Sequence, residues 1–250
     1  MQHLIEWLLA PVSGFANHEI APWAYWHARC MVLGWGVLLP LGVLVARFFK
    51  VMPGQDWPLV VDNKTWWHAH RLLQYGGVLL MLIGLLLAWG HAAGESAIAQ
   101  AHRYLGWTVV VLGLGQIVLA WSRGSKGGPT GNQLQGDHYD MTPWRLAFER
   151  LHKWGGYAAL LLALVVIVLG LVVADAPRWM WLLLSLWWLA LGVAVYALQV
   201  QGRCIDTYQA IWGPDTGTAA SRLPPTGWGV RRYTSAKWQE KFKKKSLENL

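Results

Sequence analysis

The sequence predicts an all-α integral membrane protein, a helical bundle with five transmembrane helices. Its 250 residues are 55% hydrophobic and only 14% charged, with a mean hydropathy of +0.30, which is too apolar for a soluble domain. Five apolar stretches are long enough to cross a bilayer core of about 30 Å. These stretches cover residues 27–49, 66–90, 101–122, 151–174 and 179–200. The segments 50–65 and 123–149 are rich in Pro, Asn and Asp and are typical of loops.

Residues 1–26 precede the first span and are expected to form an amino-terminal segment on the outer side of the membrane. Leu4, Leu8 and Leu9 share one side of a short helix that Pro11 would end, so this helix should lie along the membrane surface. The first twelve residues contain no Lys or Arg and carry Glu6 within the apolar stretch, which is unlike a signal peptide.

The first span contains Pro40 near its middle. Proline has no backbone N–H, so it leaves one carbonyl of the preceding turn without its helical donor. We expect a kink here unless a neighbouring helix satisfies that carbonyl.

Lys and Arg cluster on one side of the predicted spans. That side contains Arg47, Lys50, Lys64, Arg123, Lys126, Arg145, Arg150, Arg231, Arg232, Lys243, Lys244 and Lys245. The other side has Arg29, Arg103 and Arg178. The positive-inside rule therefore predicts an outer amino terminus and a cytoplasmic carboxyl terminus. The basic segment 201–250 is expected to meet anionic lipid or a partner protein rather than nucleic acid.

Four histidines each open a different predicted span: His27, His70, His102 and His152. Because consecutive spans alternate in direction, His27 and His102 should lie at one depth, and His70 and His152 at the other. Two histidines that face each other within a bundle are what a six-coordinate haem iron requires. The pattern predicts a four-helix core that holds two haems stacked across the bilayer, with the irons roughly 20 Å apart.

Glycines accompany these histidines at helical spacing, as close packing around a porphyrin would need. They are Gly34 after His27, Gly77 and Gly84 after His70, Gly106 and Gly113 after His102, and Gly155 and Gly156 after His152. Transmembrane helices are rich in glycine for other reasons, so this signal gains weight only beside the histidines.

Each candidate ligand also has a cation beside it. These cations are Arg29, Arg71, Arg103 and Lys153. They could bind haem propionates through charge-assisted hydrogen bonds, or they could reach toward the membrane surface, and the two roles are compatible.

The remaining histidines are not expected to bind iron. His68 is two residues from His70 and points about 200° away, so it cannot face the same haem. His3, His18, His91 and His138 fall in segments expected at the surface. Cys30 and Cys204 are too few for a zinc site or a disulfide framework.

The histidine segments resemble those of the cytochrome b561 family. They read Trp26-His27-Ala-Arg-Cys-Met-Val-Leu-Gly-Trp-Gly-Val-Leu-Leu-Pro40, Trp66-Trp67-His68-Ala69-His70-Arg71-Leu-Leu-Gln74, His102-Arg103-Tyr-Leu-Gly106 and His152-Lys153-Trp-Gly-Gly-Tyr157. The resemblance covers residues 22–200 and is greatest to the bacterial and DOMON-associated branch.

The resemblance implies a b561-like transmembrane domain over residues 27–200, with two haem b groups and electron transfer across a bacterial inner membrane. In the family the second ligand precedes a glutamine by four residues, which selects His70. Two departures are that this chain has five spans rather than six and no fused DOMON domain. We also find no dinucleotide-binding fingerprint, so the electrons should come from a redox partner protein or a small reductant.

The sequence therefore favours a transmembrane electron-transfer oxidoreductase component. Two other classes stay open. One is a haem-containing anchor or assembly subunit, for which the segment with Trp212, Trp228 and Trp238 would be a docking element. The other is a quinol oxidoreductase, for which the predicted spans contain no carboxylate near a ligand and only Gln74 and Gln116 as polar candidates.

Overall fold

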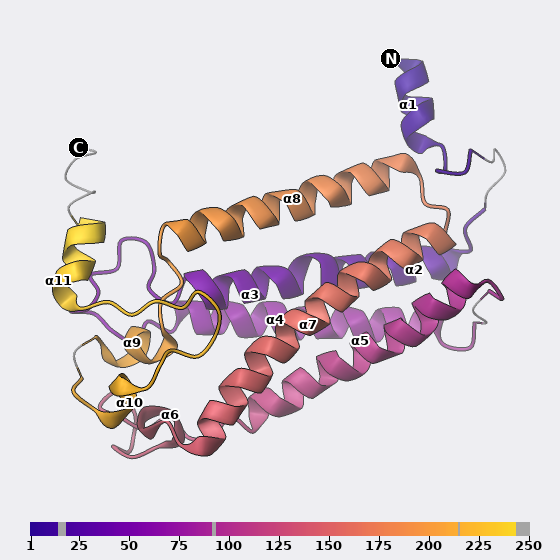
Figure 1. The fold of residues 1–250 in the computed structure, drawn as a ribbon. Helices are drawn as coiled ribbons and strands as arrows, with labels where there is room; N and C mark the ends of the chain where they lie inside the picture. The colour runs from indigo at the N-terminus through magenta and orange to yellow at the C-terminus, as the bar shows by residue number, and fades with distance from the viewer. Residues whose placement is uncertain (15–18, 92–93, 215, 244–250) are drawn as a thin grey trace. The chain divides into compact units, whose positions relative to one another are not determined.

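The computed structural model describes residues 1–14, 19–91, 94–214 and 216–243, and these residues form helices joined by loops (Figure 1). The helices are α1 (Gln2–Leu9), α2 (Pro22–Met31), a π-helical segment (Val32–Leu38), α3 (Leu39–Phe48), α4 (Thr65–Ala88), α5 (Ala97–Trp121), α6 (Asp137–Asp140), α7 (Pro143–Val173), α8 (Arg178–Val200), α9 (Thr207–Trp212), α10 (Ala219–Arg222), α11 (Ser235–Trp238) and a second π-helical segment (Gln239–Lys243). No β-strand occurs in these ranges, so the predicted all-α class is confirmed.

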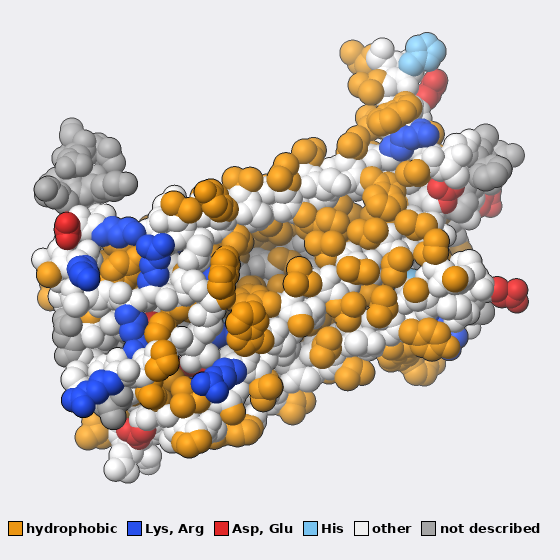
Figure 2. Space-filling model, in the orientation of Figure 1, with side chains coloured by type: hydrophobic (Ala, Val, Ile, Leu, Met, Phe, Trp, Pro, Cys, Tyr) orange, Lys and Arg blue, Asp and Glu red, His pale blue; other side chains and the backbone are white. Residues whose placement is uncertain are grey.

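In the residues that the structure describes, five helical stretches are long and apolar enough to cross a membrane. They are Pro22–Phe48, Thr65–Ala88, Ala97–Trp121, Pro143–Val173 and Arg178–Val200. Figure 2 shows hydrophobic side chains on the exposed sides of the long helices, where a soluble protein would carry polar ones. The five predicted spans are thereby confirmed, and they support a multi-pass membrane protein.

The long helices begin earlier than the apolar stretches suggested. The difference is largest for α7, which starts at Pro143 rather than near residue 151. Thr142 precedes this proline, and its hydroxyl accepts a hydrogen bond from the backbone N–H of Arg145 at 3.3 Å. A threonine cap followed by proline is a strong helix start. Ser96 caps α5 in the same way, through the N–H of Ala99 at 3.2 Å.

The first span is continuous through Pro40 but passes through the π-helical segment just before it. The carbonyl of Gly36, four residues before Pro40, accepts a hydrogen bond from the indole N–H of Trp187 on α8 at 2.8 Å. The carbonyl that proline leaves without a helical donor is thus satisfied by a neighbouring helix, as a membrane interior requires.

The chain divides into two compact units. Unit 1 comprises Met1–Gly42, Arg71–Gly115 and Gly156–Tyr196. Its core is made of apolar side chains from α3, α4, α5, α7, α8 and the π-helical segment before α3, and Met81 at its centre is fully buried. Gly113 lets α5 approach Trp35, because a Cβ at this glycine would lie 2.9 Å from the indole ring.

Helix α1 belongs to unit 1 and packs through its carboxyl end. Arg178 donates a hydrogen bond to the carbonyl of Trp7 at 3.1 Å and lies over its ring, while the N–H of Ser13 bonds to Asp175 at 3.0 Å. Its large apolar side chains Leu4, Ile5 and Leu9 are exposed. The predicted short helix is present, and its position along a membrane surface stays a prediction.

Unit 2 comprises Val43–His70, Gln116–Gly155 and Ala197–Leu250. Its described part has two small cores, one around Val51, Trp57, Ile205, Ala210, Tyr233 and Trp238, and one around Met141, Tyr208, Ile211, Trp212 and Ala220. Residues expected to form a basic tail therefore fold with the two interhelical loops. Of the three tryptophans considered as docking residues, Trp212 and Trp238 are buried and only Trp228 is exposed, at 63%.

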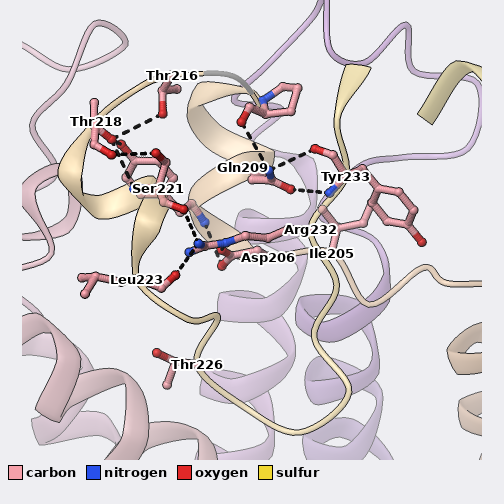
Figure 3. Close-up of polar contacts among 12 residues, drawn as sticks. Ile205, Asp206, Gln209, Thr216, Thr218, Ser221, Leu223, Thr226, Arg232 and Tyr233 are labelled. Atoms are coloured by element: carbon pink, nitrogen blue, oxygen red, sulfur yellow. Dashed lines mark hydrogen bonds and ion pairs between the residues drawn. The ribbon is translucent and has the colours of Figure 1, made fainter. Parts of the chain in front are cut away.

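Polar contacts stabilise the folded segment that follows α8 (Figure 3). Asp206 forms an ion pair with Arg232, whose guanidinium also donates to the carbonyls of Ser221 and Leu223. The amide of Gln209 bonds to both backbone groups of Tyr233, at 2.9 and 3.1 Å. The segment is thus an ordered part of unit 2 as far as residue 243.

Candidate haem sites

The four candidate ligands lie deeper in their helices than expected. His27, His70 and His102 are each the sixth residue of α2, α4 and α5, and His152 is the tenth residue of α7. The prediction that each occupies the first turn was wrong: α2, α5 and α7 start four or more residues before the predicted apolar stretches, and α4 starts one residue before its stretch.

In unit 1 the structure brings together His27 and His102. Their ring centres are 6.2 Å apart and the ring planes are nearly perpendicular, at 82°. Nδ1 of His27 lies 2.8 Å from the carbonyl oxygen of Gly84, and Nδ1 of His102 lies 3.0 Å from that of Val166. A carbonyl can only accept, so both rings carry their proton on Nδ1 and keep the Nε2 lone pair for a metal.

Glycines make these two hydrogen bonds possible. A Cβ at Gly170, one turn after Val166, would lie 3.0 Å from Cε1 of His102 and 3.4 Å from its Nδ1. A Cβ at Gly84 would lie 3.1 Å from Cβ of Cys30 and 3.4 Å from the carbonyl oxygen of His27. Gly84 was predicted from the sequence, whereas Gly170 was not. The sequence feature that could have identified Gly170 is its spacing, since it follows His152 by 18 residues, which is five helical turns.

In unit 2 the structure brings together His70 and His152. Their ring centres are 6.5 Å apart and the planes are at 85°. Phe148 stacks on His152 with ring centres 5.3 Å apart, and Trp67 lies beside His70 at 6.2 Å. Nδ1 of His152 is buried and has no hydrogen-bond partner.

Both pairs fit a bis-histidine haem. The centres of two imidazoles bound to opposite sides of one metal should lie about 6 Å apart, from metal–nitrogen bonds of about 2 Å plus the ring radius on each side. No group of three or more His, Cys, Asp or Glu side chains gathers in the described residues to hold a bare metal ion. A pair of imidazoles suits a haem, because the porphyrin supplies the other four donors to the iron.

The other histidines fall into two groups. His68 and His3 are exposed, and His91 is exposed while stacking on Trp23 with ring centres 4.2 Å apart. His18 lies outside the described residues. His138 was expected at the surface, and this was wrong: it is only 5% exposed, because α6 packs it against Trp212. Burial and the nearby Arg145 hold the pKa of His138 well below its usual range.

A buried carboxylate lies one turn before His152, contrary to the sequence analysis. Glu149 is 5% exposed, and the early start of α7 places it inside the fourth span. Its Oε1 accepts from Arg145 at 3.1 Å, and its Oε2 accepts from Lys153 at 2.8 Å. His138 Nε2 lies 3.6 Å from Oε1. The carboxylate is thus engaged at both oxygens.

The four cations beside the ligands differ in their surroundings. Arg29 is exposed and lies over the ring of Trp26 at 4.8 Å, and Arg71 is exposed and lies over Tyr75 at 5.6 Å. Arg103 is exposed. Lys153 is partly buried and donates to both Glu149 and the carbonyl of Thr226. Their contact with propionates stays a prediction.

Several predicted glycines serve helix contacts within one unit. A Cβ at Gly34 would lie 2.9 Å from the carbonyl of Gly77, and a Cβ at Gly77 would lie 2.7 Å from Leu39. At Gly106 the nearest atom, on Val166, would be 3.9 Å away, which is an ordinary contact.

The two polar candidates within the spans also have defined places. Gln74 donates to the carbonyl of Leu39 at 3.1 Å. Gln116 packs on Gly155, where a Cβ would lie 2.6 Å from its Nε2, and its own Oε1 is buried without a partner.

Comparison with known proteins finds relatives among eukaryotic membrane cytochromes. A cytochrome b561, DM13 and DOMON domain-containing protein of Arabidopsis thaliana is 30% identical over 170 residues, 68% of this chain and 17% of that protein. The human protein ferric-chelate reductase 1 is 30% identical over 115 residues, 46% of this chain and 19% of that protein. A second Arabidopsis protein, with cytochrome b561 and DOMON domains, is 26% identical over 149 residues, 60% of this chain and 31% of that protein.

The chain therefore spans less than a third of the length of each of these relatives. No family model and no solved structure matches the chain.

Proposed function

We propose that this chain, whose relatives support its assignment to the cytochrome b561 family, binds two b-type haems and carries electrons across a membrane. The observation that carries the proposal is the presence of two histidine pairs, each within one compact unit and each with ring centres 6.2 or 6.5 Å apart. One pair would support a single haem, whereas two pairs supply the two relay points that transfer across a bilayer needs.

The bound haems would supply reversible one-electron chemistry, and the chain's own residues would hold and tune them. His27 and His102 would present Nε2, because the carbonyls of Gly84 and Val166 fix their tautomer and ring orientation. In unit 2, Phe148 holds the ring of His152 by stacking. Arg29, Arg71 and Arg103, which are exposed, would bind propionates through charge-assisted hydrogen bonds.

The partners and the location belong to the same proposal. We propose that the electron donor is a redox partner protein or a small reductant. The first electron acceptor to test is a ferric chelate, because the name of one relative contains this substrate. The predicted bacterial inner membrane and the cytoplasmic carboxyl terminus stay predictions, since the relatives compared are eukaryotic.

The two alternative functions, quinol oxidoreductase and haem-containing anchor subunit, predict different properties of the buried groups. A quinol oxidoreductase needs a carboxylate that can release a proton, but Glu149 is bound by both Arg145 and Lys153. An anchor subunit would hold haems that keep one redox state during turnover, so stopped-flow spectra during electron transfer distinguish it from a carrier.

The proposal is tested by a reduced-minus-oxidised spectrum of the purified chain with haem quantified per polypeptide. We expect two low-spin b-type haems per chain. A value of one haem, or a high-spin spectrum in the wild type, would refute the two-site proposal. Reconstitution in vesicles with a reductant on one side and a ferric chelate on the other then tests transfer across the membrane.

A further inference from the structure

The loop that contains Trp228 is bound to the ends of two membrane spans within unit 2. Arg47, near the end of α3, donates a hydrogen bond to the carbonyl of Trp228 at 2.7 Å and lies over its ring at 5.2 Å. Gln199, near the end of α8, donates to the carbonyl of Gly229 at 2.8 Å and accepts from Arg47 at 3.0 Å. Each of these two donors is the last residue but one of its span. The contacts therefore hold the loop at the depth where the spans leave the bilayer.

The backbone of the loop presents the side chain of Trp228 at the surface. Gly227 and Gly229 flank it with φ angles of +113° and +65°, which residues with a side chain rarely adopt. Lys153 also binds the loop, through the carbonyl of Thr226 at 2.8 Å. The indole of Trp228 stays exposed although Arg47 covers part of it. Tryptophan is enriched where a membrane meets water, because its ring is apolar and its N–H is polar.

Two more exposed tryptophans lie at the same end of the long helices (Figure 1). Trp121 is the last residue of α5, and Trp144 is the second residue of α7. The indole N–H of Trp144 donates to the carbonyl of Ser122 at 2.7 Å, which ties the start of α7 to the end of α5. Tryptophans at the ends of spans are typical of a membrane surface. Trp228 adds to this group from a segment that follows the last span.

Cations lie at the carboxyl end of α8, close to the same loop. Arg231 is exposed and follows Trp228 by three residues, which span at most about 11 Å. A Cβ at Gly202, just after α8, would lie 2.8 Å from Nζ of Lys241 and 3.4 Å from Nη1 of Arg231. Figure 2 shows Lys and Arg side chains gathered over this end of unit 2. Cations complement the negative end of a helix dipole, and two that converge on one point can also hold a phosphate.

We propose that the surface made of Trp228, Arg231 and Lys241 binds an anionic phospholipid of the membrane that the chain spans. Arg231 and Lys241 would donate charge-assisted hydrogen bonds to the headgroup phosphate, and the indole would lie among the glycerol and upper acyl carbons. Lipid is favoured over an acidic protein because the loop is bonded to the ends of two spans and its exposed ring is largely apolar. The inference goes beyond electron transfer and does not depend on how many haems the chain binds.

Unfolding temperatures of the purified full chain in detergent test the preference for anionic lipid, since a ligand that binds the folded state raises them. Phosphatidylglycerol should raise the wild-type value more than phosphatidylcholine does, and high salt should shrink this difference. Arg231→Gln should lose most of the difference. Lys237→Gln removes an exposed cation from the same segment and should keep it. Equal effects of the two lipids on the wild type, an unchanged difference in Arg231→Gln, or equal losses in both variants would overturn the proposal.

Substitutions of the tryptophan test the apolar part of the surface. Trp228→Ala should reduce the stabilisation by phosphatidylglycerol, whereas Trp228→Tyr should retain most of it, because tyrosine shares the preference for the membrane surface. Equal stabilisation of the alanine variant and the wild type would exclude a role for the indole. Soluble polyglutamate that stabilised the wild type as strongly as phosphatidylglycerol would overturn the lipid in favour of an acidic protein.

A spin label at position 228 tests the depth of the loop without relying on unfolding. Cys30 and Cys204 are buried, so a nitroxide reagent should react mainly with the cysteine introduced by Trp228→Cys. In vesicles of phosphatidylglycerol and phosphatidylcholine, oxygen, which partitions into the bilayer, should relax the label more than a water-soluble nickel chelate does. Stronger relaxation by the nickel chelate would place the loop in water and overturn the proposal.

Discussion

At the residue scale, substitution of single histidines tests which two of them bind the same haem. Substituting His27 or His102 by Ala should remove or convert to high spin the same haem, and the double variant should lose no more than either single one. His70→Ala and His152→Ala should affect the other haem. Absorption and electron paramagnetic resonance spectra of the purified variants measure this.

The control for this series is His68→Ala, which changes an exposed histidine two residues from His70. Both haems should remain. If His68→Ala removed a haem, or if His27→Ala and His70→Ala damaged the same centre, the assignment of ligands would be wrong.

Glu149 is the carboxylate that pairs with the cations Arg145 and Lys153 beside His152. Glu149→Gln would leave Arg145 buried without an anionic partner, which typically destabilises a protein by about 3–5 kcal/mol. Thermal unfolding in detergent should show a clear loss of stability, whereas Glu95→Gln, a change at an exposed position, should have little effect. Equal stability of the two variants would show that the buried ion cluster contributes nothing net.

The sequence predicts some of these residues and not others, for a physical reason. Four histidines were predicted as ligands because each lies near the start of a different apolar span, and because the alternating direction of the spans predicts which two share a depth. They are His27, His70, His102 and His152. The burial of His138 depends on α6 packing against Trp212, 74 residues later in the chain. Such long-range packing leaves no local pattern to read.

At the element scale, the first residues of the long helices cannot be predicted from hydrophobicity alone. Apolar residues mark the part of a helix that meets lipid, but Thr142 and Pro143 decide where α7 begins. Helix α7 has 31 residues and is about 46 Å long, which exceeds a hydrocarbon core of about 30 Å. Glu149 was missed for this reason, since it lies in the turns before the apolar stretch.

The contact between α8 and the first span gives a testable prediction. Trp187→Phe removes the donor to the carbonyl of Gly36, leaving an unsatisfied carbonyl beside Pro40, and should destabilise the protein by about 1–3 kcal/mol. The matched control is Trp181→Phe on the same helix, whose indole N–H is buried without a partner. Similar unfolding temperatures for the two variants would show that another donor replaces Trp187.

At the scale of the whole molecule, unit 2 carries a titratable group outside the spans. Lys50 is buried and donates to the carbonyl of Ile205 at 2.8 Å, and burial lowers its pKa from 10.5 to about 8. Between these two pH values the unfolded chain binds more protons at this site than the folded chain. Stability should therefore rise as the pH increases from about 8 toward 10.5, by up to about 3 kcal/mol.

Unfolding temperatures measured across this pH range test the prediction. Lys50→Met should flatten the dependence, whereas Lys64→Met, at an exposed lysine, should keep it. A dependence that persists in Lys50→Met would assign it to another group.

The orientation of the chain in the membrane is tested separately. The cations after the first, third and fifth spans predict that a reporter fused after Leu250 reads cytoplasmic and that one inserted at Gly94 reads outside. The reverse result would exchange the faces that the two histidine pairs approach and leave the pairs intact.

The core around Trp57 has a consequence for the order of events during biosynthesis. Val51 and Trp57 precede the second span, but the side chains that cover them include Ile205, Tyr233 and Trp238, which follow the fifth. At about 5–20 residues per second, a ribosome adds Trp238 roughly 10–40 s after Trp57. During that interval the indole of Trp57 lacks the side chains of Tyr233 and Trp238, and a message truncated before residue 233 would yield a polypeptide that can cover it only with earlier residues such as Ile205 and Ala210.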